Sequence, residues 1–220
     1  MKREDEKVKQ KYDKLAKNMA FYYLTMVVGR TTENSIFRKK AISVLGLNNN
    51  SVILDAACGT GYNFKLIERY LGKNGKLVGI DISSESLRLA KALALKNNWN
   101  NIELLNMSIT DYKPKILYDA VLCTYAKEII PQFKSVIDMT YNLLKPNGIF
   151  SMIGMKLSSQ IPYKHMNFFL KRVYQIWGVD VSRDIIGYVK SKFKITFYEE
   201  HFFGFYYILS GTKLPEIKKP

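Results

Sequence analysis

Two acidic residues and a pair of glycines have the types and the spacing that suit a nucleoside. Asp55 ends an apolar run that indicates a buried strand, and Gly59 and Gly61 follow it in a tight loop. A strand that leads through a glycine turn into a helix brings backbone N–H groups and a helix N-terminus close to a ligand. A second apolar strand ends at Asp81, whose carboxylate can accept hydrogen bonds from both hydroxyls of a ribose. We therefore predict a nucleoside site along this loop.

The residues around the loop exclude a dinucleotide. A dinucleotide fingerprint needs the pattern G-x-G-x-x-G, and Tyr62, Asn63 and Phe64 follow the second glycine here, so the third glycine is missing. Asp55 would also repel a pyrophosphate, because like charges disfavour each other at short range. The same carboxylate would suit a ligand that carries an ammonium group.

Four segments resemble the motifs of one enzyme family, in that family's order. Residues 55–61, D-x-x-C-G-T-G, resemble the first motif of the class I methyltransferases, which use S-adenosylmethionine (SAM). Residues 81–83 resemble the ribose-binding loop, residues 118–125 the fourth strand, and residues 143–150 the helix–turn–strand hallmark LLKPGG. The resemblance implies SAM as the cofactor and methyl transfer as the activity.

The resemblance also implies which residues contact the cofactor. Asp55 would contact the methionine ammonium directly or indirectly, Asp81 would bind the ribose unless it only caps a helix, and Ile82 would pack on the adenine. The family commonly holds the adenine amino group with an acidic residue where this chain has Ser108, a weaker acceptor; Asp111 is a substitute or a surface residue. The full predicted set is Asp55, Ala57, Cys58, Gly59, Gly61, Asn63, Asp81, Ile82, Met107, Ser108 and Cys123.

Three residues are candidates for the reacting side of the site. Tyr125 follows the fourth strand, where this fold exposes residues beside the methyl group. Tyr22 lies in a segment that resembles the N-terminal part of the ubiquinone/menaquinone C-methyltransferases and phospholipid N-methyltransferases. His165 is a candidate base. The alternative role of each tyrosine is packing, and the alternative role of the histidine is structural. No His/Asp cluster has metal-ligand spacing, so we expect no metal.

The alternation of apolar strands and amphipathic segments predicts the fold class. We expect an α/β, Rossmann-like sheet of seven strands, mostly parallel, with helices on both faces and a C-terminal antiparallel strand. The expected strands are 52–55, 76–80, 101–106, 118–123, 148–154, 192–198 and 203–211. The expected helices are 3–17, about 32–45, 62–70, 84–96, 132–144, 162–177 and 182–190.

Length and composition predict one cytoplasmic domain. A chain of 220 residues that is 47% apolar can form one core. Its predicted parts are a helical lid (1–48), a SAM-binding core (49–155), a substrate-side helical insertion (156–190) and C-terminal strands (191–220). The run 19–28 is too short for a membrane span. We expect no disulfide framework from two cysteines, and peripheral attachment to a membrane is an open alternative.

The net charge of +15 leaves the methyl acceptor open. Solubility, an anionic membrane surface and nucleic acid are the three explanations of this charge. Nucleic acid is less favoured, because no known nucleic-acid-binding motif is present. The first choice of acceptor is a lipophilic small molecule, a phospholipid amine or a quinone precursor. The alternatives are a soluble amine, thiol or phenol, an RNA, or no acceptor at all if the chain is an inactive SAM-binding partner subunit.

Overall fold

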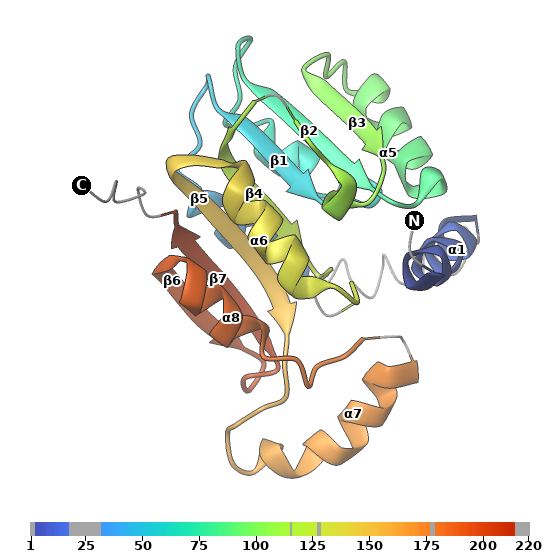
Figure 1. Cartoon of the computed structure of the whole chain (residues 1–220), viewed down its shortest axis with the longest axis vertical. Helices are drawn as coiled ribbons and strands as arrows, with labels where there is room; N and C mark the ends of the chain where they lie inside the picture. The colour runs from blue at the N-terminus through green and yellow to red at the C-terminus, as the bar shows by residue number, and fades with distance from the viewer. Residues whose placement is uncertain (1–2, 18–31, 115, 127–128, 177–178, 214–220) are drawn as a thin grey trace.

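Strands and helices alternate through most of the chain (Figure 1). The computed structural model describes residues 3–17, 32–114, 116–126, 129–176 and 179–213. The strands are β1 (Val52–Ala56), β2 (Lys76–Asp81), β3 (Ile102–Asn106), β4 (Tyr118–Thr124), β5 (Leu144–Met155), β6 (Lys194–His201) and β7 (Tyr206–Thr212). The helices are α1 (Arg3–Lys17), α3 (Thr32–Ser43), α4 (Phe64–Ile67), α5 (Ser84–Lys96), α6 (Phe133–Leu143), α7 (Asn167–Ile176) and α8 (Ile185–Lys192), with the short 3-10 helices η1 (Ile109–Asp111) and η2 (Tyr163–Met166).

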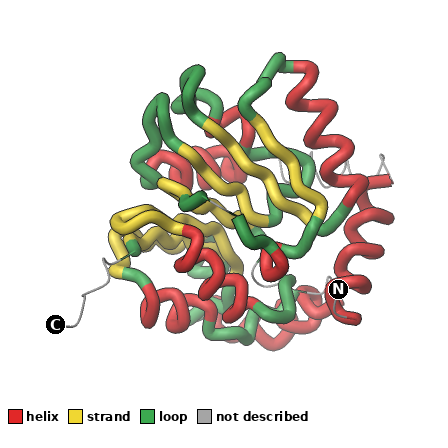
Figure 2. The backbone as a smooth tube through the Cα atoms, turned by 45° about the horizontal axis from the view of Figure 1, so that its top comes forward, coloured by secondary structure: helices red, strands yellow, loops and turns green. Residues whose placement is uncertain are grey.

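Seven strands form one sheet in the order β3-β2-β1-β4-β5-β7-β6. The neighbours from β3 to β5 are parallel, and β7 runs antiparallel to both of its neighbours. Parallel neighbours need crossover connections, and the helices of these connections lie on both sides of the twisted sheet (Figure 2). The predicted fold class, including the antiparallel strand near the C-terminus, is confirmed.

Both faces of the sheet are buried, so its central strands are continuous apolar runs. In β1, Ile53 packs in a cluster with residues of α3, α4 and α5, while Leu54 packs in a second cluster with residues of α6 and α8. Leu77 and Val78 of β2 divide between the same two clusters. These four side chains are at most 1% exposed, and each such burial stabilises the fold by about 1.5–3 kcal/mol.

The helix predicted over residues 62–70 is shorter in the structure, where α4 has only four residues. Asn63 precedes this helix but does not cap it, because its side chain instead donates to Asp55 in β1. At the other end the chain turns away, and the Gly72 N–H donates to the Asn49 carbonyl at 2.9 Å. The Asn63 side chain therefore bonds to Asp55 in the site and does not cap α4.

The last strand begins three residues later than the predicted 203. Phe202, Phe203 and Gly204 have φ values of 48°, 56° and 83°, so the chain makes a left-handed turn between β6 and β7. Residues in this conformation do not continue a strand. The long helix predicted after β5 is likewise divided, into η2 and α7.

Two helices lie beyond the carboxyl ends of the parallel strands (Figure 1). α1 packs against α5, where the Asp13 carboxylate accepts hydrogen bonds from Ser83 Oγ (2.6 Å) and the Glu85 N–H (3.3 Å). α7 follows the end of β5. Within the described ranges, no helix has both the length and the apolar character that crossing a bilayer requires.

A candidate cofactor site at the carboxyl edge of the sheet

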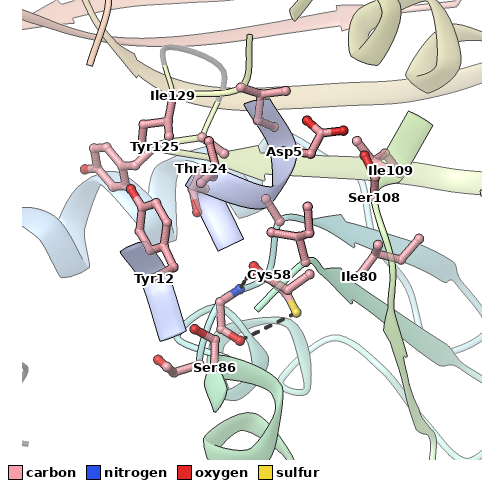
Figure 3. A pocket seen from close by; sticks show the side chains of 18 of the residues that line it. Asp5, Tyr12, Cys58, Ile80, Ser86, Ser108, Ile109, Thr124, Tyr125 and Ile129 are labelled. Atoms are coloured by element: carbon pink, nitrogen blue, oxygen red, sulfur yellow. Dashed lines mark hydrogen bonds between the residues drawn. The ribbon is translucent and has the colours of Figure 1, made fainter. Parts of the chain in front are cut away.

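A cavity of about 400 Å³ lies where β1, β2 and β4 end. Gly59 lines it from the loop after β1, Asp81 from the end of β2, and Tyr125 from the residue after β4. Figure 3 shows Cys58, Thr124 and Tyr125 among the side chains around it. Parallel strands bring their carboxyl ends to one edge, so segments that are distant in the sequence meet there. The volume lies in the usual range for sites that bind small molecules, roughly 300–1,000 Å³.

α1 forms one wall of this cavity. The residues that face it recur every three or four positions and so share one side of the helix: Asp5, Val8, Tyr12 and Ala16. Ala16 is buried, which shows that the helix is packed against the protein at this end. The lid predicted over residues 1–48 thus includes a segment that covers the cavity, although its opening and closing stays a prediction.

Asp81 holds together two segments beside the cavity. Its Oδ2 accepts the Gly59 N–H at 2.8 Å, and its Oδ1 accepts the Ser83 N–H at 2.9 Å. Burial raises the pKa of Asp81, and these N–H donors oppose that rise. Ser83, not Asp81, is the N-cap of α5, because Ser83 Oγ accepts the Ser86 N–H. A carboxylate has about four acceptor positions, so Asp81 can also accept from the hydroxyls of a ribose.

The two glycines of the loop have different structural constraints. Gly59 has a φ of +55°, and a Cβ built there would meet open space beside the cavity. Gly61 has a φ of +81°, and a Cβ there would lie 2.7 Å from ring atoms of Phe64, which is fully buried. Gly59 therefore leaves room for a ligand, and Gly61 leaves room for the core.

Alanine substitutions should separate these two roles. Gly61→Ala should lower the free energy of unfolding by about 2 kcal/mol or more, from left-handed strain and overpacking together. Gly59→Ala should cost only about 1 kcal/mol of strain but weaken binding of SAM, the ligand the sequence predicts, about tenfold or more. Urea unfolding and titration calorimetry measure the two effects. Equal losses of stability in both variants would contradict this assignment.

A buried polar network lies beneath the loop. Both oxygens of Asp55 accept from Asn63 Nδ2 at 3.0 Å, and Asn63 Oδ1 accepts from Arg38 Nη1 at 2.6 Å. Thr124 Oγ1 lies 3.2 Å from Asn63 Nδ2 and 2.8 Å from Arg38 Nη1. Burial raises the pKa of Asp55 to about 7, against the opposing effects of Asn63 and Arg38. Asn63 thus joins a buried carboxylate to a guanidinium.

Arg38 is a site residue that the sequence did not indicate. It lines the cavity, and its guanidinium carbon lies 5.4 Å from the ring centre of Tyr62 and 5.1 Å from that of Tyr125. Burial lowers the pKa of Arg38, but a guanidinium stays charged in proteins. It is a cation that can bind the carboxylate of an amino-acid ligand through two N–H groups. Arg38 stands in an ordinary polar stretch, R-K-K, so no local pattern marks it.

The structure brings eight of the predicted site residues to the cavity wall: Ala57, Cys58, Gly59, Asp81, Ile82, Met107, Ser108 and Tyr125. Ser108 Oγ lies 2.9 Å from Thr110 Oγ1, so a partner within its own turn engages this hydroxyl. Tyr125 has a φ of +57°, an uncommon conformation for a residue with a Cβ, and its N–H donates to Ile153.

The other predicted residues lie elsewhere. Asp55, Gly61, Asn63 and Cys123 do not line the cavity, and Asp55 and Asn63 reach it only through Arg38 and Thr124. His165 is exposed on η2, away from the cavity wall, and Tyr22 lies outside the described residues. The described segments contain no group of three or more His, Cys, Asp or Glu side chains that could hold a metal ion.

Comparison with known proteins gives the family. Residues 47–181, more than half of the chain, match the family described as methyltransferase domain. The demethylmenaquinone methyltransferase of Lactococcus lactis is 32% identical over 119 residues, which cover 53% of this chain and 46% of that protein. The protein of the same name from Oceanobacillus iheyensis is 22% identical over 185 residues, 83% of this chain and 74% of that one. The chain thus spans less than half of the Lactococcus protein.

Solved structures share the fold. The N-methyltransferase NodS of Bradyrhizobium japonicum, in complex with S-adenosylhomocysteine, has a TM-score of 0.70 at 13% identity, over 93% of this chain and 97% of that one. Geranyl diphosphate C-methyltransferase of Streptomyces coelicolor has a TM-score of 0.68 at 9% identity, over 82% and 81%. Identities this low show the fold alone, but the match over residues 47–181 goes further. The chain therefore belongs to the class I methyltransferases, the family that uses S-adenosylmethionine as its methyl donor.

Proposed function

We propose that the protein transfers a methyl group from SAM to a lipophilic small molecule, a quinone precursor or a phospholipid amine. The observation that carries the proposal is the apolar wall beyond Tyr125, where Ala126, Ile129, Ile130 and Pro131 line the cavity next to the nucleoside side. An acceptor that approaches from this side meets aliphatic side chains. The relatives named demethylmenaquinone methyltransferases support a quinone precursor.

The residues at the cavity fit SAM. Asp81 has acceptor positions for the ribose, Gly59 leaves open space, and Arg38 is a cation for the methionine carboxylate.

Bound SAM would supply a methyl group that its sulfonium charge already activates. The chain then has to align the acceptor and exclude water, and α1 covers the cavity for that purpose. Tyr125 stands where the two ligands would meet, and we assign it the positioning of the acceptor. The nucleophilic atom of the acceptor would form its bond to the methyl carbon as the carbon–sulfur bond breaks with its electron pair on sulfur, and the acceptor would lose its proton to solvent.

An exposed aromatic surface on α7 supports delivery of the acceptor from a membrane. Phe168 is 77% exposed and Phe169 68% exposed. Lys164, Lys171 and Arg172 are exposed in the same segment, and Arg172 lies over the Phe168 ring at 5.6 Å. Basic residues beside inserted aromatics suit an anionic bilayer, where each cation contributes about 1 kcal/mol. α7 lies beyond the same edge of the sheet as the cavity (Figure 1).

Methyl transfer into lipid vesicles tests this function. With methyl-labelled SAM and phosphatidylglycerol vesicles that contain demethylmenaquinone and phosphatidylethanolamine, label should enter one of these two lipids. The rate should fall about tenfold or more in phosphatidylcholine vesicles or at high salt, because surface attraction is screened. Label found only in added RNA, or only in soluble phenols, thiols or amines, would contradict the proposal in favour of those acceptors. No label in any fraction, with SAM still bound, would indicate an inactive SAM-binding subunit.

A paired variant separates the membrane contact from the chemistry. Phe168→Ser with Phe169→Ser changes two exposed side chains, so stability should stay within about 0.5 kcal/mol. The variant should lose sedimentation with anionic vesicles and keep methyl transfer to a short-chain, water-soluble quinone. Unchanged sedimentation would show that α7 does not contact the membrane.

A further inference from the structure

We propose that Asp5, carried by α1, accepts the hydrogen bond of the adenine amino group and so selects adenine in the cofactor. This inference rests on the proposed function only in taking SAM as the ligand. It assigns to the N-terminal helix a contact that the core of the fold does not supply.

Asp5 is a buried residue whose carboxyl group faces the cavity. Its side chain is 6% exposed, and it lines the cavity. Figure 3 shows it directed into this space, on the side of Ser108 and Ile109. Among the described residues, none donates a hydrogen bond to Asp5 or forms an ion pair with it. Because the cavity opens onto this carboxylate, a ligand bound there can supply a hydrogen-bond donor.

The other carboxylates of the site have donors from the protein. Asp81 accepts the N–H groups of Gly59 and Ser83, and Asp55 accepts the amide of Asn63. Asp5 differs from both, because no described residue donates to it and all of its acceptor positions are available to a ligand. This difference favours a role in binding over a role in the scaffold.

The strand order fixes which part of the cofactor would reach Asp5. Asp81, the ribose acceptor, lies between β1 on one side and β3 on the other. Arg38 bonds to Thr124 at the end of β4, beyond β1, so the amino-acid end of SAM extends that way. The base must then extend the opposite way, over the residues that follow β3. Met107, Ser108 and Ile109 line the cavity there.

The loop after β3 does not bring a carboxylate of its own to the cavity. Ser108 is engaged with Thr110, and Asp111 is exposed and does not line the cavity. Ile82, Met107 and Ile109 offer apolar surface for the faces of a purine. The exocyclic amino group of adenine donates two hydrogen bonds at its edge. Asp5 is the acceptor that the structure places on this side, across from the loop.

The position of Asp5 on α1 supports this role. Asp5 lies in the first turn of α1, where the helix dipole favours a negative charge. The same helix is held at α5 through Asp13 and Ser83, two turns farther along. A base that binds Asp5 therefore binds a helix that is already attached to the ribose side of the site.

The test compares S-adenosylhomocysteine with S-inosylhomocysteine, in which a carbonyl oxygen replaces the amino group. Titration calorimetry of the full chain should show that the wild type prefers the adenosine compound about thirtyfold or more, because a carboxylate repels the carbonyl oxygen. Asp5→Asn should reverse much of this preference. Its amide can donate to the inosine oxygen, so binding of the inosine compound should strengthen while binding of the adenosine compound weakens about tenfold.

Asp13→Asn is the matched control on the same helix. Asp13 does not line the cavity, so its loss should loosen α1 and weaken both compounds by the same factor. If Asp5→Asn also weakens both equally, Asp5 is only structural and the inference fails. If the wild type binds neither compound, the proposed function fails, which is a separate result.

Discussion

Asp81→Ala should weaken SAM binding about a hundredfold or more. If Asp81 binds the ribose as we propose, the variant loses two hydrogen bonds from ribose hydroxyls to a carboxylate, at about 1.5–3 kcal/mol each, and each 1.4 kcal/mol is a factor of ten. The substitution also leaves the N–H groups of Gly59 and Ser83 without their acceptor. We therefore expect the free energy of unfolding to fall by about 1–3 kcal/mol as well. Calorimetry with SAM and urea unfolding of the ligand-free protein measure the two losses.

A second carboxylate in the same sheet provides the control. Asp119 accepts the Val52 N–H at 2.8 Å and pairs with Lys145, at the opposite ends of β1 and β4 from the cavity. Asp119→Ala should cost a comparable amount of stability and leave SAM affinity within about threefold. If both variants lose affinity alike, Asp81 acts through the stability of the sheet and the ribose assignment is wrong.

The sequence predicted those parts of the site that depend on local pattern. An apolar run fixes β1, and the residues after it in the chain are the residues at the carboxyl edge. Gly59 and Asp81 could therefore be placed without knowing any long-range contact. The same holds for the mostly parallel sheet, because strands that alternate with helices favour parallel pairing. The order of the strands was not predicted and comes from the structure.

Residues that reach the cavity from helices, and not from the ends of the predicted strands, could not be predicted. Arg38 and Asp5 lie on helices whose sequences look like ordinary solvated surface, and only tertiary packing places them in the cavity. His165 shows the reverse case. A lone histidine after the core motifs was a candidate base, but η2 holds it exposed, away from the cavity wall.

A pH dependence centred on Asp55 is the second large effect that we expect. Burial raises the pKa of Asp55 from its ordinary value of 3.8 to about 7 in the folded protein. A carboxyl group whose pKa is raised by folding stabilises the fold in its protonated form. This contribution is complete below about pH 4 and is lost as the pH rises to 7. Asp55→Asn removes the titration, so the variant should gain up to about 4 kcal/mol relative to the wild type between pH 4 and 8.

Cofactor binding should show the opposite preference. The ammonium group of SAM favours an ionised Asp55, even through the intervening Asn63, because charges interact strongly in a poorly solvated interior. Below pH 7 the dissociation constant of SAM should therefore rise about tenfold for each unit by which the pH falls, and above pH 7 it should be constant.

The variant Asp55→Asn is the control for this pH dependence. Burial raises the pKa of Asp81 too, so the difference between the wild type and Asp55→Asn isolates the contribution of Asp55. Calorimetry in buffers of different ionisation enthalpy should detect about half a proton released per SAM at pH 7, and none attributable to this site in Asp55→Asn. A wild-type affinity that stays constant from pH 5.5 to 8 would show that Asp55 supports the loop and does not sense the charge of the cofactor.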